Sequence, residues 1–163
     1  MLVGAISKSS VISFEPDSDT FLKPKRNIHL NKLRKNIRIH NLGLGDKEQK
    51  VSFKSMRNNG HNYILNSEVG DKKVKIIPLE KIKLETIPSL IKIDVEGYED
   101  RALKPFFEAA PETLFPKNIV IEYTSQHEWE DKDFINYLMK KGYRLKMRTR
   151  GNLCLSLHTN NPQ

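Results

Sequence analysis

The sequence predicts an α/β protein with a largely parallel sheet. Short apolar runs alternate along the chain with segments of helical pattern, and turn residues separate the two kinds of segment. The chain has 163 residues, of which 37% are hydrophobic and 29% charged, so it can form a modest core and is not a disordered chain. We therefore expect one domain over residues 1–157, followed by a short tail at residues 158–163.

The N-terminal part of the chain predicts a strand, a helix and a second strand. Residues 11–14 (VISF) are a short apolar run stopped by Glu-Pro, which is typical of a buried strand. Residues 17–35 begin with acidic and hydroxyl residues that cap helices, and Pro24 predicts either the helix start or a kink. The alternation over residues 36–42 suits a strand, and GLGD at 43–46 predicts a turn.

The middle of the chain predicts a hairpin, a strand and a helix. Residues 50–53 and 73–79 are expected to pair as a hairpin across a long polar stretch. Residues 89–95 (SLIKIDV) are a strong strand candidate. The following residues, 98–109, predict a helix with a break at Pro105.

The C-terminal part predicts a strand, a helix and an antiparallel hairpin. Residues 118–123 (NIVIEY) read as a strand, and residues 131–141 as a helix. Gly142 takes the position after the helix end, where glycine is preferred. Residues 143–149 and 153–157 then form the hairpin.

Composition limits the classes of function. With 28 Lys and Arg against 20 Asp and Glu, the net charge is +8, which permits a polyanionic partner. The sequence has no zinc-finger, basic-zipper or aromatic-interleaved recognition pattern, so a lysine-rich solvated surface is the favoured interpretation and nucleic acid an unlikely partner. No apolar run approaches the ~20 residues of a membrane helix, and the N-terminus lacks a signal-peptide pattern. Cys154, the single cysteine, excludes an intramolecular disulfide and indicates a cytoplasmic location.

Polar side chains gather at the ends of the predicted strands. In open α/β sheets, ligands bind outside the carboxyl ends of the strands. A carboxylate that ends a strand of a nucleotide-binding unit accepts hydrogen bonds from the ribose hydroxyls, and Glu15 suits that role. A single such acid is better explained as a helix cap, but several together favour a site. The strand-end residues are Glu15, Asn41, Gly43, Asp94, Glu96 and Glu122.

Four stretches of the sequence resemble the FkbM-type S-adenosylmethionine-dependent methyltransferases. They are FEPDSDTF…NIHLN (14–31), HNLGLGDKEQKVSF (40–53), LIKIDVEGYEDRAL (90–103) and GYRLKMRTRGNLCL (142–155). The resemblance implies a Rossmann-like class I methyltransferase sheet, mostly parallel, with a C-terminal antiparallel hairpin. It also implies methyl transfer from S-adenosylmethionine, usually to an oxygen of a small molecule or glycan.

The resemblance also implies roles for individual residues. Glu15 is expected to bind the ribose, and Asp94 and Glu96 to face the methyl donor and the acceptor. Gly97 lets the backbone turn there. The adenine would be lined by a loop of Asn41, Leu42, Gly43 and Leu44, and the acceptor would lie near Asn59 and His61.

A hydroxyl acceptor needs a nearby base, for which three residues are candidates. They are Asp94, Glu122 and His61, and we place Asp94 first because strand ends hold side chains more rigidly than loops. His61 is equally well explained as a solvated loop residue. No metal is expected for this chemistry, and the histidines show no metal-ligand spacing.

The sequence departs from the family pattern before Glu15. Relatives open with a strand and a glycine-rich loop, whereas only Gly4 precedes Glu15 here. The first strand and its loop are therefore expected to be missing, which leaves unpaired strand edges. Two alternatives to a working methyltransferase stay open: a truncated, non-catalytic remnant of the family, and a basic module that binds RNA or another polyanion. The acceptor and the oligomeric state cannot be predicted from these residues.

Overall fold

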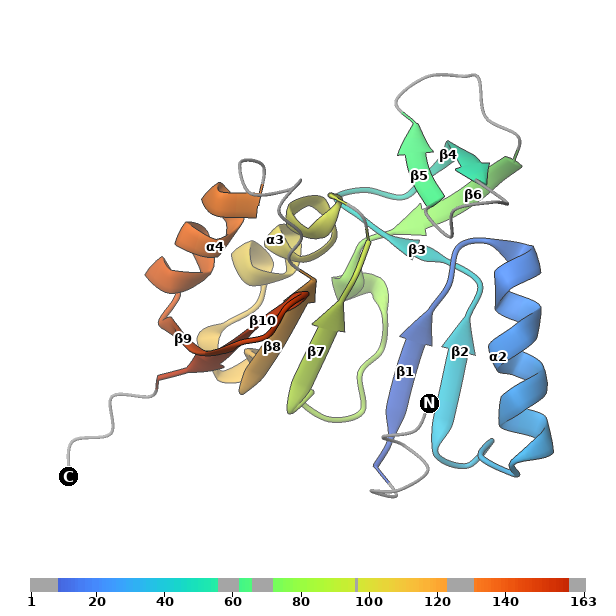
Figure 1. Cartoon of the computed structure of the whole chain (residues 1–163), viewed down its shortest axis with the longest axis horizontal. Coiled ribbons are helices and arrows are strands. Elements are labelled where there is room, and N and C mark those ends of the chain that lie inside the picture. The colour runs from blue at the N-terminus through green and yellow to red at the C-terminus, as the bar shows by residue number, and fades with distance from the viewer. Residues whose placement is uncertain (1–8, 56–61, 66–71, 96, 123–130, 159–163) are drawn as a thin grey trace. The chain divides into compact units, whose positions relative to one another are not determined.

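The chain has a mixed α/β fold, described by a computed structural model (Figure 1). The structure describes residues 9–55, 62–65, 72–95, 97–122 and 131–158. Three helices and three sheets lie within these ranges. The chain divides into two compact units, Met1–Ile77 and Pro78–Gln163. A single domain over residues 1–157 stays a prediction.

The first unit contains two sheets and one helix. Its elements are β1 (Val11–Phe14), α2 (Ser18–Leu30), β2 (Ile37–His40), β3 (Gly43–Leu44), β4 (Gln49–Ser55), β5 (Asn62–Leu65) and β6 (Lys72–Ile77). β1 and β2 pair in parallel, and α2 runs beside them (Figure 1). The second sheet has the order β3-β6-β4-β5, with β3 parallel to β6 and β4 antiparallel to β5 and β6.

Helix α2 begins at Ser18, so the expectation that the helix starts near Pro24 is wrong. Asp17 is its N-cap, and the Asp17 carboxylate accepts a hydrogen bond from the Asp19 N–H at 3.1 Å. Pro24 therefore lies inside the helix rather than at its start. Because proline has no amide hydrogen, the carbonyl of Thr20 loses its intrahelical donor at this point.

Two strands of the first unit were not expected from the sequence. Residues 43–46 were expected to turn, but Gly43 and Leu44 pair with Ile76 and Ile77 as the short strand β3. β5 lies on the far edge of β4, within the stretch expected to be a polar connection. The antiparallel pairing expected for residues 50–53 and 73–79 is confirmed between β4 and β6, although β5 lies between these two strands in the chain.

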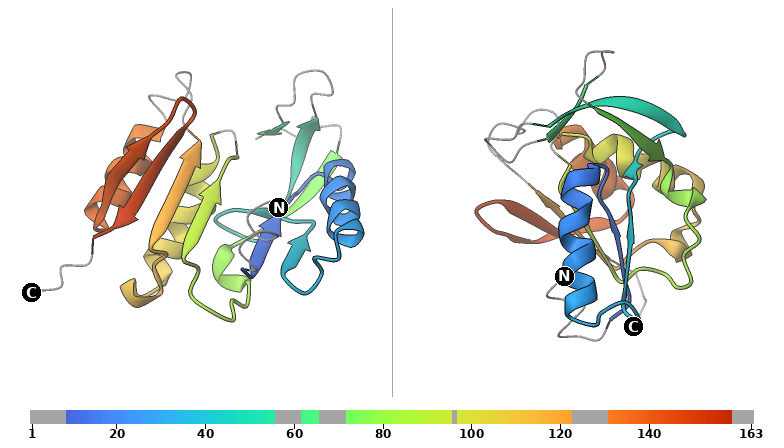
Figure 2. Two further views of the ribbon diagram at one scale, coloured as in Figure 1. Left: turned by 60° about the horizontal axis from the view of Figure 1, so that its bottom comes forward. Right: turned by 90° about the vertical axis from the view of Figure 1, so that its right-hand side faces the viewer.

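The second unit is a four-stranded sheet with both helices on one face (Figure 2). The sheet order is β7-β8-β10-β9, in which β7 and β8 are parallel and β10 is antiparallel to both of its neighbours. The elements are η1 (Leu79–Lys81), β7 (Leu90–Ile93), α3 (Glu99–Ala109), η2 (Glu112–Leu114), β8 (Asn118–Glu122), α4 (Asp131–Lys140), β9 (Tyr143–Arg148) and β10 (Asn152–Leu157).

The core of the second unit explains its helix boundaries. The expected break at Pro105 is not seen, because the buried side chains of Leu103 and Phe106 on either side keep α3 in the core. Helix α4 ends as expected, since Gly142 has a φ of 95° in the left-handed region. The buried ring of Tyr143 packs edge-to-face on Phe107 at 5.8 Å.

Each unit has a strand with one edge that lacks a partner among the described strands. β1 pairs only with β2, and β7 only with β8. The expected loss of the first strand and one continuous Rossmann-like sheet both stay predictions. No helix in the described ranges combines the length and apolar character needed to cross a bilayer.

Candidate functional site

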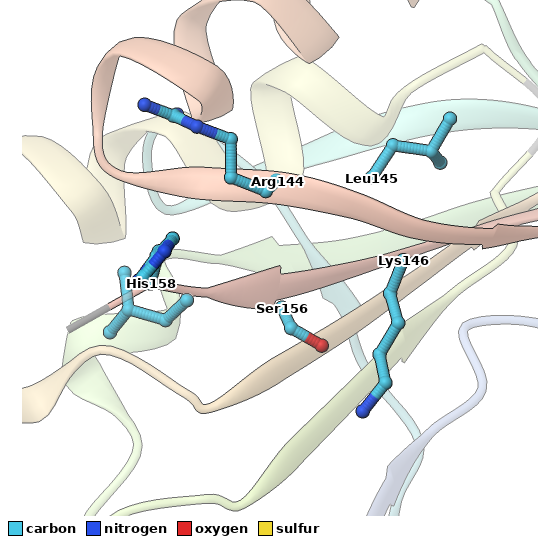
Figure 3. A pocket seen from close by; sticks show the side chains of 6 residues that line it. Arg144, Leu145, Lys146, Ser156 and His158 are labelled. Atoms are coloured by element: carbon cyan, nitrogen blue, oxygen red, sulfur yellow. The ribbon is translucent and has the colours of Figure 1, made fainter.

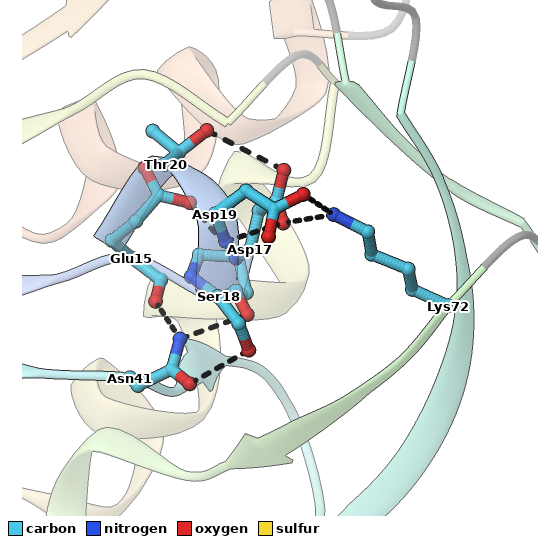
Figure 4. Close-up of polar contacts among 8 residues, drawn as sticks. Glu15, Asp17, Ser18, Asp19, Thr20, Asn41 and Lys72 are labelled. Carbon is cyan, nitrogen blue, oxygen red and sulfur yellow. Dashed lines mark hydrogen bonds and ion pairs between the residues drawn. The ribbon is translucent and has the colours of Figure 1, made fainter. Parts of the chain in front are cut away.

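Glu15 occupies the turn between β1 and α2. Its N–H donates to the His40 carbonyl at 3.0 Å, which continues the parallel pairing beyond the end of β1. Its side-chain Oε1 accepts from the Asp17 N–H at 2.9 Å (Figure 4). The second oxygen, Oε2, has no hydrogen-bond donor among the described residues. A half-buried carboxylate with one oxygen held and one available is suited to accept hydrogen bonds from a diol.

The environment of Glu15 opposes its ionisation. Burial raises the pKa of the carboxyl group, the hydrogen bond from the Asp17 N–H lowers it, and the negative charge of Asp17 raises it again. The net result is a pKa above the ordinary value for glutamate. A raised pKa of this origin is typical of functional sites.

Asn41 holds the Glu15 turn from the neighbouring strand. Its Nδ2 donates to the carbonyls of Glu15 at 2.8 Å and Pro16 at 3.1 Å, and its Oδ1 accepts from the Ser18 hydroxyl at 3.1 Å. Figure 4 shows these contacts together. The structure thus brings Asn41 and Glu15 into one cluster, with the Asn41 amide bound to the turn.

Gly43 packs against the same turn. A Cβ at this position would collide with the Ile76 side chain and lie 3.5 Å from the Pro16 Cβ. Glycine is therefore favoured here, because a larger residue would force the buried Ile76 side chain to move. Leu42 and Leu44, on either side of Gly43, are half-buried.

Asp17 is a buried charge with several partners. Its side chain is 3% exposed, and Oδ1 lies 2.8 Å from the Lys72 Nζ. Burial raises the pKa of Asp17, but hydrogen bonds from Lys72, the Asp19 N–H and the Thr20 hydroxyl outweigh it, so the pKa is lower than usual. Sequence reasoning treated Asp17 only as a helix cap and did not identify Lys72 at all.

Asp94 and Glu122 end neighbouring parallel strands of the second unit. Ile93 and Ile121 are register partners, so the next residue of each strand follows at the same edge. Burial raises the pKa of Asp94, but hydrogen bonds from the Glu122 side chain and from Lys92, at 2.6 Å, bring it below its usual value. The side chains of Asp94 and Glu122 therefore lie close enough for each to influence the ionisation of the other.

Glu99 is a buried acid that sequence reasoning missed. It is 2% exposed at the start of α3, and its Oε1 accepts from the Val95 N–H at 3.1 Å. Its Oε2 is buried without a partner among the described residues. Gly97 turns the preceding loop with a φ of 84°, as expected. The signal for Glu99 was the third acid of IDVEGYE, which looks like an ordinary first-turn helix residue.

A model of the methyltransferase FkbM domain matches residues 5–145. The chain belongs to the FkbM methyltransferase family. The crystal structure of a methyltransferase FkbM from Methylobacillus flagellatus KT has a similar fold, with a TM-score of 0.60 and 22% sequence identity. The match covers 96% of this chain and 39% of that one, so the chain spans well under half the length of that relative. No curated protein sequence matches the chain significantly.

Three of the residues expected in this FkbM-family site lie outside the described residues. They are Asn59, His61 and Glu96. Their roles stay predictions. Within the described ranges, no three side chains of the metal-binding types cluster closely enough to hold an ion.

A recess on the FkbM chain lies away from the residues expected to act. It is an open hollow of about 270 Å³ at the edge strand β9, lined by Arg144, Leu145, Lys146, Ser156, Leu157 and His158 (Figure 3). The Arg144 guanidinium already donates to the carbonyls of Met139 and Tyr143, and the Ser156 hydroxyl to Asn118. None of the expected site residues lines this hollow, so it does not define the candidate site.

Proposed function

We propose that this FkbM-family chain is an S-adenosylmethionine-dependent methyltransferase that methylates an oxygen of a small molecule or glycan. The observation that carries the proposal is the Glu15 carboxylate, held on one oxygen by the Asp17 N–H at 2.9 Å. Carboxylates at the end of a strand in nucleotide-binding folds accept the ribose hydroxyls of the ligand. The residue thus fits the nucleoside part of the cofactor.

The remaining cofactor contacts would come from the chain beyond β2. Leu42 and Leu44 supply half-buried apolar surface, and the buried Gly43 brings the backbone close to the Glu15 turn. A flat adenine ring is well matched to an apolar surface of this kind. Asn41 would act by fixing the Glu15 turn as well as by lining the adenine.

Asp94 would serve as the base that removes the acceptor's hydroxyl proton. Its lowered pKa keeps it ionised at neutral pH, and Lys92 contacts its Oδ2 at 2.6 Å. S-adenosylmethionine, when bound, supplies an electrophilic methyl group. The chain's own task is then to position the acceptor oxygen and take its proton. Glu96, Asn59 and His61 are proposed acceptor-binding residues, with His61 a further candidate base, and a cytoplasmic location stays part of the proposal.

Calorimetric titration of S-adenosylhomocysteine into the chain tests the proposal. We expect micromolar binding by the wild type and a loss of at least about tenfold in Glu15→Gln, since a neutral amide is a weaker acceptor for the diol. The matched control is Glu48→Gln, which changes a half-exposed acid of the same unit that pairs with Lys75 at 2.8 Å. The control should bind like the wild type.

Two results of this titration would contradict the proposal, in whole or in part. A folded wild-type chain that binds no S-adenosylhomocysteine would contradict cofactor binding by this polypeptide. Equal affinities in the wild type and Glu15→Gln would leave cofactor binding standing but remove Glu15 from it.

A further inference from the structure

Lys72, the first residue of β6, reaches the turn that holds Glu15. Its Nζ lies 2.8 Å from Asp17 Oδ1 and 2.6 Å from Asp19 Oδ2 (Figure 4). The Asp17 side chain is 3% exposed and the Asp19 side chain 71% exposed. Ion pairs in contact with bulk water contribute little, so the contact with Asp17 is the one that constrains the fold.

Asp17 links Lys72 to the Glu15 carboxylate. Its side chain accepts from Lys72, from the Asp19 N–H at 3.1 Å and from the Thr20 hydroxyl at 3.4 Å. Its own backbone N–H then donates to Glu15 Oε1 at 2.9 Å. A residue whose side chain is fixed at several points presents its N–H in a fixed direction, and that N–H sets the orientation of Glu15.

The positive charge of Lys72 also supports the ionised form of Glu15. The negative charge of Asp17 disfavours ionisation of Glu15. An ammonium group in contact with Asp17 offsets that repulsion. Without Lys72, the buried Asp17 carboxylate would lose its cation and repel an ionised Glu15 more strongly.

We propose that Lys72 is a positioning residue for cofactor binding, which acts by fixing Asp17 so that the Asp17 N–H orients the Glu15 carboxylate. The proposal rests on the proposed function, because it assigns Glu15 the same role toward the nucleoside. Within the described residues, Lys72 pairs with Asp17 and Asp19 rather than with Glu15. Lys72 therefore acts through Asp17 and is not itself a ligand-binding group.

The test compares three lysine variants by titration with S-adenosylhomocysteine. We expect Lys72→Met to weaken binding about tenfold, as the loss of one charge-assisted constraint would. Lys72→Arg keeps the cation and should restore affinity to within about threefold of the wild type. The matched control, Lys75→Met, removes a lysine of the same strand that pairs with Glu48 at 2.8 Å, and it should leave affinity unchanged.

A second measurement reads the hydrogen bond itself without any cofactor. Amide hydrogen exchange at Asp17 reports the N–H that donates to Glu15. We expect exchange at this amide to be about tenfold faster in Lys72→Met than in Lys75→Met, at equal overall stability. If Lys72→Met does not fold, Asp17→Asn replaces it, because asparagine keeps the helix cap and removes the charge that Lys72 contacts.

The outcomes separate the two proposals. Wild-type binding with equal affinity in Lys72→Met overturns the role of Lys72 and leaves the proposed function intact. Weaker binding with unchanged Asp17 exchange also overturns it, since Lys72 would then act by charge alone. No binding by the folded wild type overturns the proposed function and the inference together.

Discussion

A half-buried carboxyl group such as Glu15 is easier to bury protonated than ionised, although its proposed ligand requires the ionised form. Its pKa is raised, so between its ordinary pKa and the raised one the folded chain holds more protons than the unfolded chain. The stability of the fold therefore falls as pH rises through that window. At neutral pH the fold bears the full free-energy cost of burying the ionised carboxylate. Binding chemistry and fold stability are thus opposed at this residue.

Glu15→Gln tests this opposition. At pH 7 the variant is expected to be at least as stable as the wild type, because it has no charge to bury, and the difference should shrink as the pH falls from the raised pKa to the ordinary one. Urea unfolding of both proteins between pH 4 and pH 7, at about one-unit intervals, measures the difference. A variant that is less stable at pH 7 would contradict the burial argument.

The strand-end pattern identified some residues of the candidate site and missed others for a physical reason. Glu15, Asn41, Asp94 and Glu122 were identifiable because each follows an apolar run. Lys72 was not, since 55 positions separate it from Asp17 and only the folded chain brings them together. The burial of Glu99 is equally invisible in a local pattern. The roles assigned to the four strand-end residues stay predictions.

Among the elements, the sequence predicted the strands that carry their own hydrophobic pattern. β1, β7, β8 and the β9–β10 hairpin are confirmed within a residue or two of the expected bounds. The two-residue strand β3 was missed, because its conformation depends on pairing with Ile76 and Ile77 rather than on local preference. Helix α2 likewise depends on the cap at Asp17, which outweighs the proline signal.

The pairing of β3 makes a prediction for Gly43. Gly43→Ala is expected to destabilise the fold by about 1–3 kcal/mol, since the new methyl group would overlap the buried Ile76 side chain. The control is Gly151→Ala, where nothing lies within 4 Å of the added Cβ, and its effect should stay within about 0.5 kcal/mol. Denaturant midpoints of the two variants measure this difference. Equal midpoints would contradict the prediction, because they would show that the Ile76 side chain moves aside for the added methyl group at little cost.

For the molecule as a whole, the sequence identified the family, and the α/β class that it predicted is confirmed in the coarser form of a mixed α/β fold. The family is confirmed by the match over residues 5–145. Expectations about one continuous sheet were harder to make from sequence, because strand order depends on contacts between distant segments. The described strands form three sheets, with both parallel and antiparallel pairs.

The side chains exposed on the edge strand β9 affect whether copies of the chain associate with one another. Leu145 and Met147 are each 54% exposed on it, and Arg144, Lys146 and Arg148 are exposed beside them. Exposed apolar residues on an edge strand favour edge-to-edge association, and like charges on two such edges oppose it. We expect Lys146→Gln to precipitate at lower salt than the wild type, as measured by light scattering, because the chain's solubility depends on repulsion that ions screen. The cations of β9 would thus keep separate copies of the chain apart in dilute buffer and cease to do so in concentrated salt.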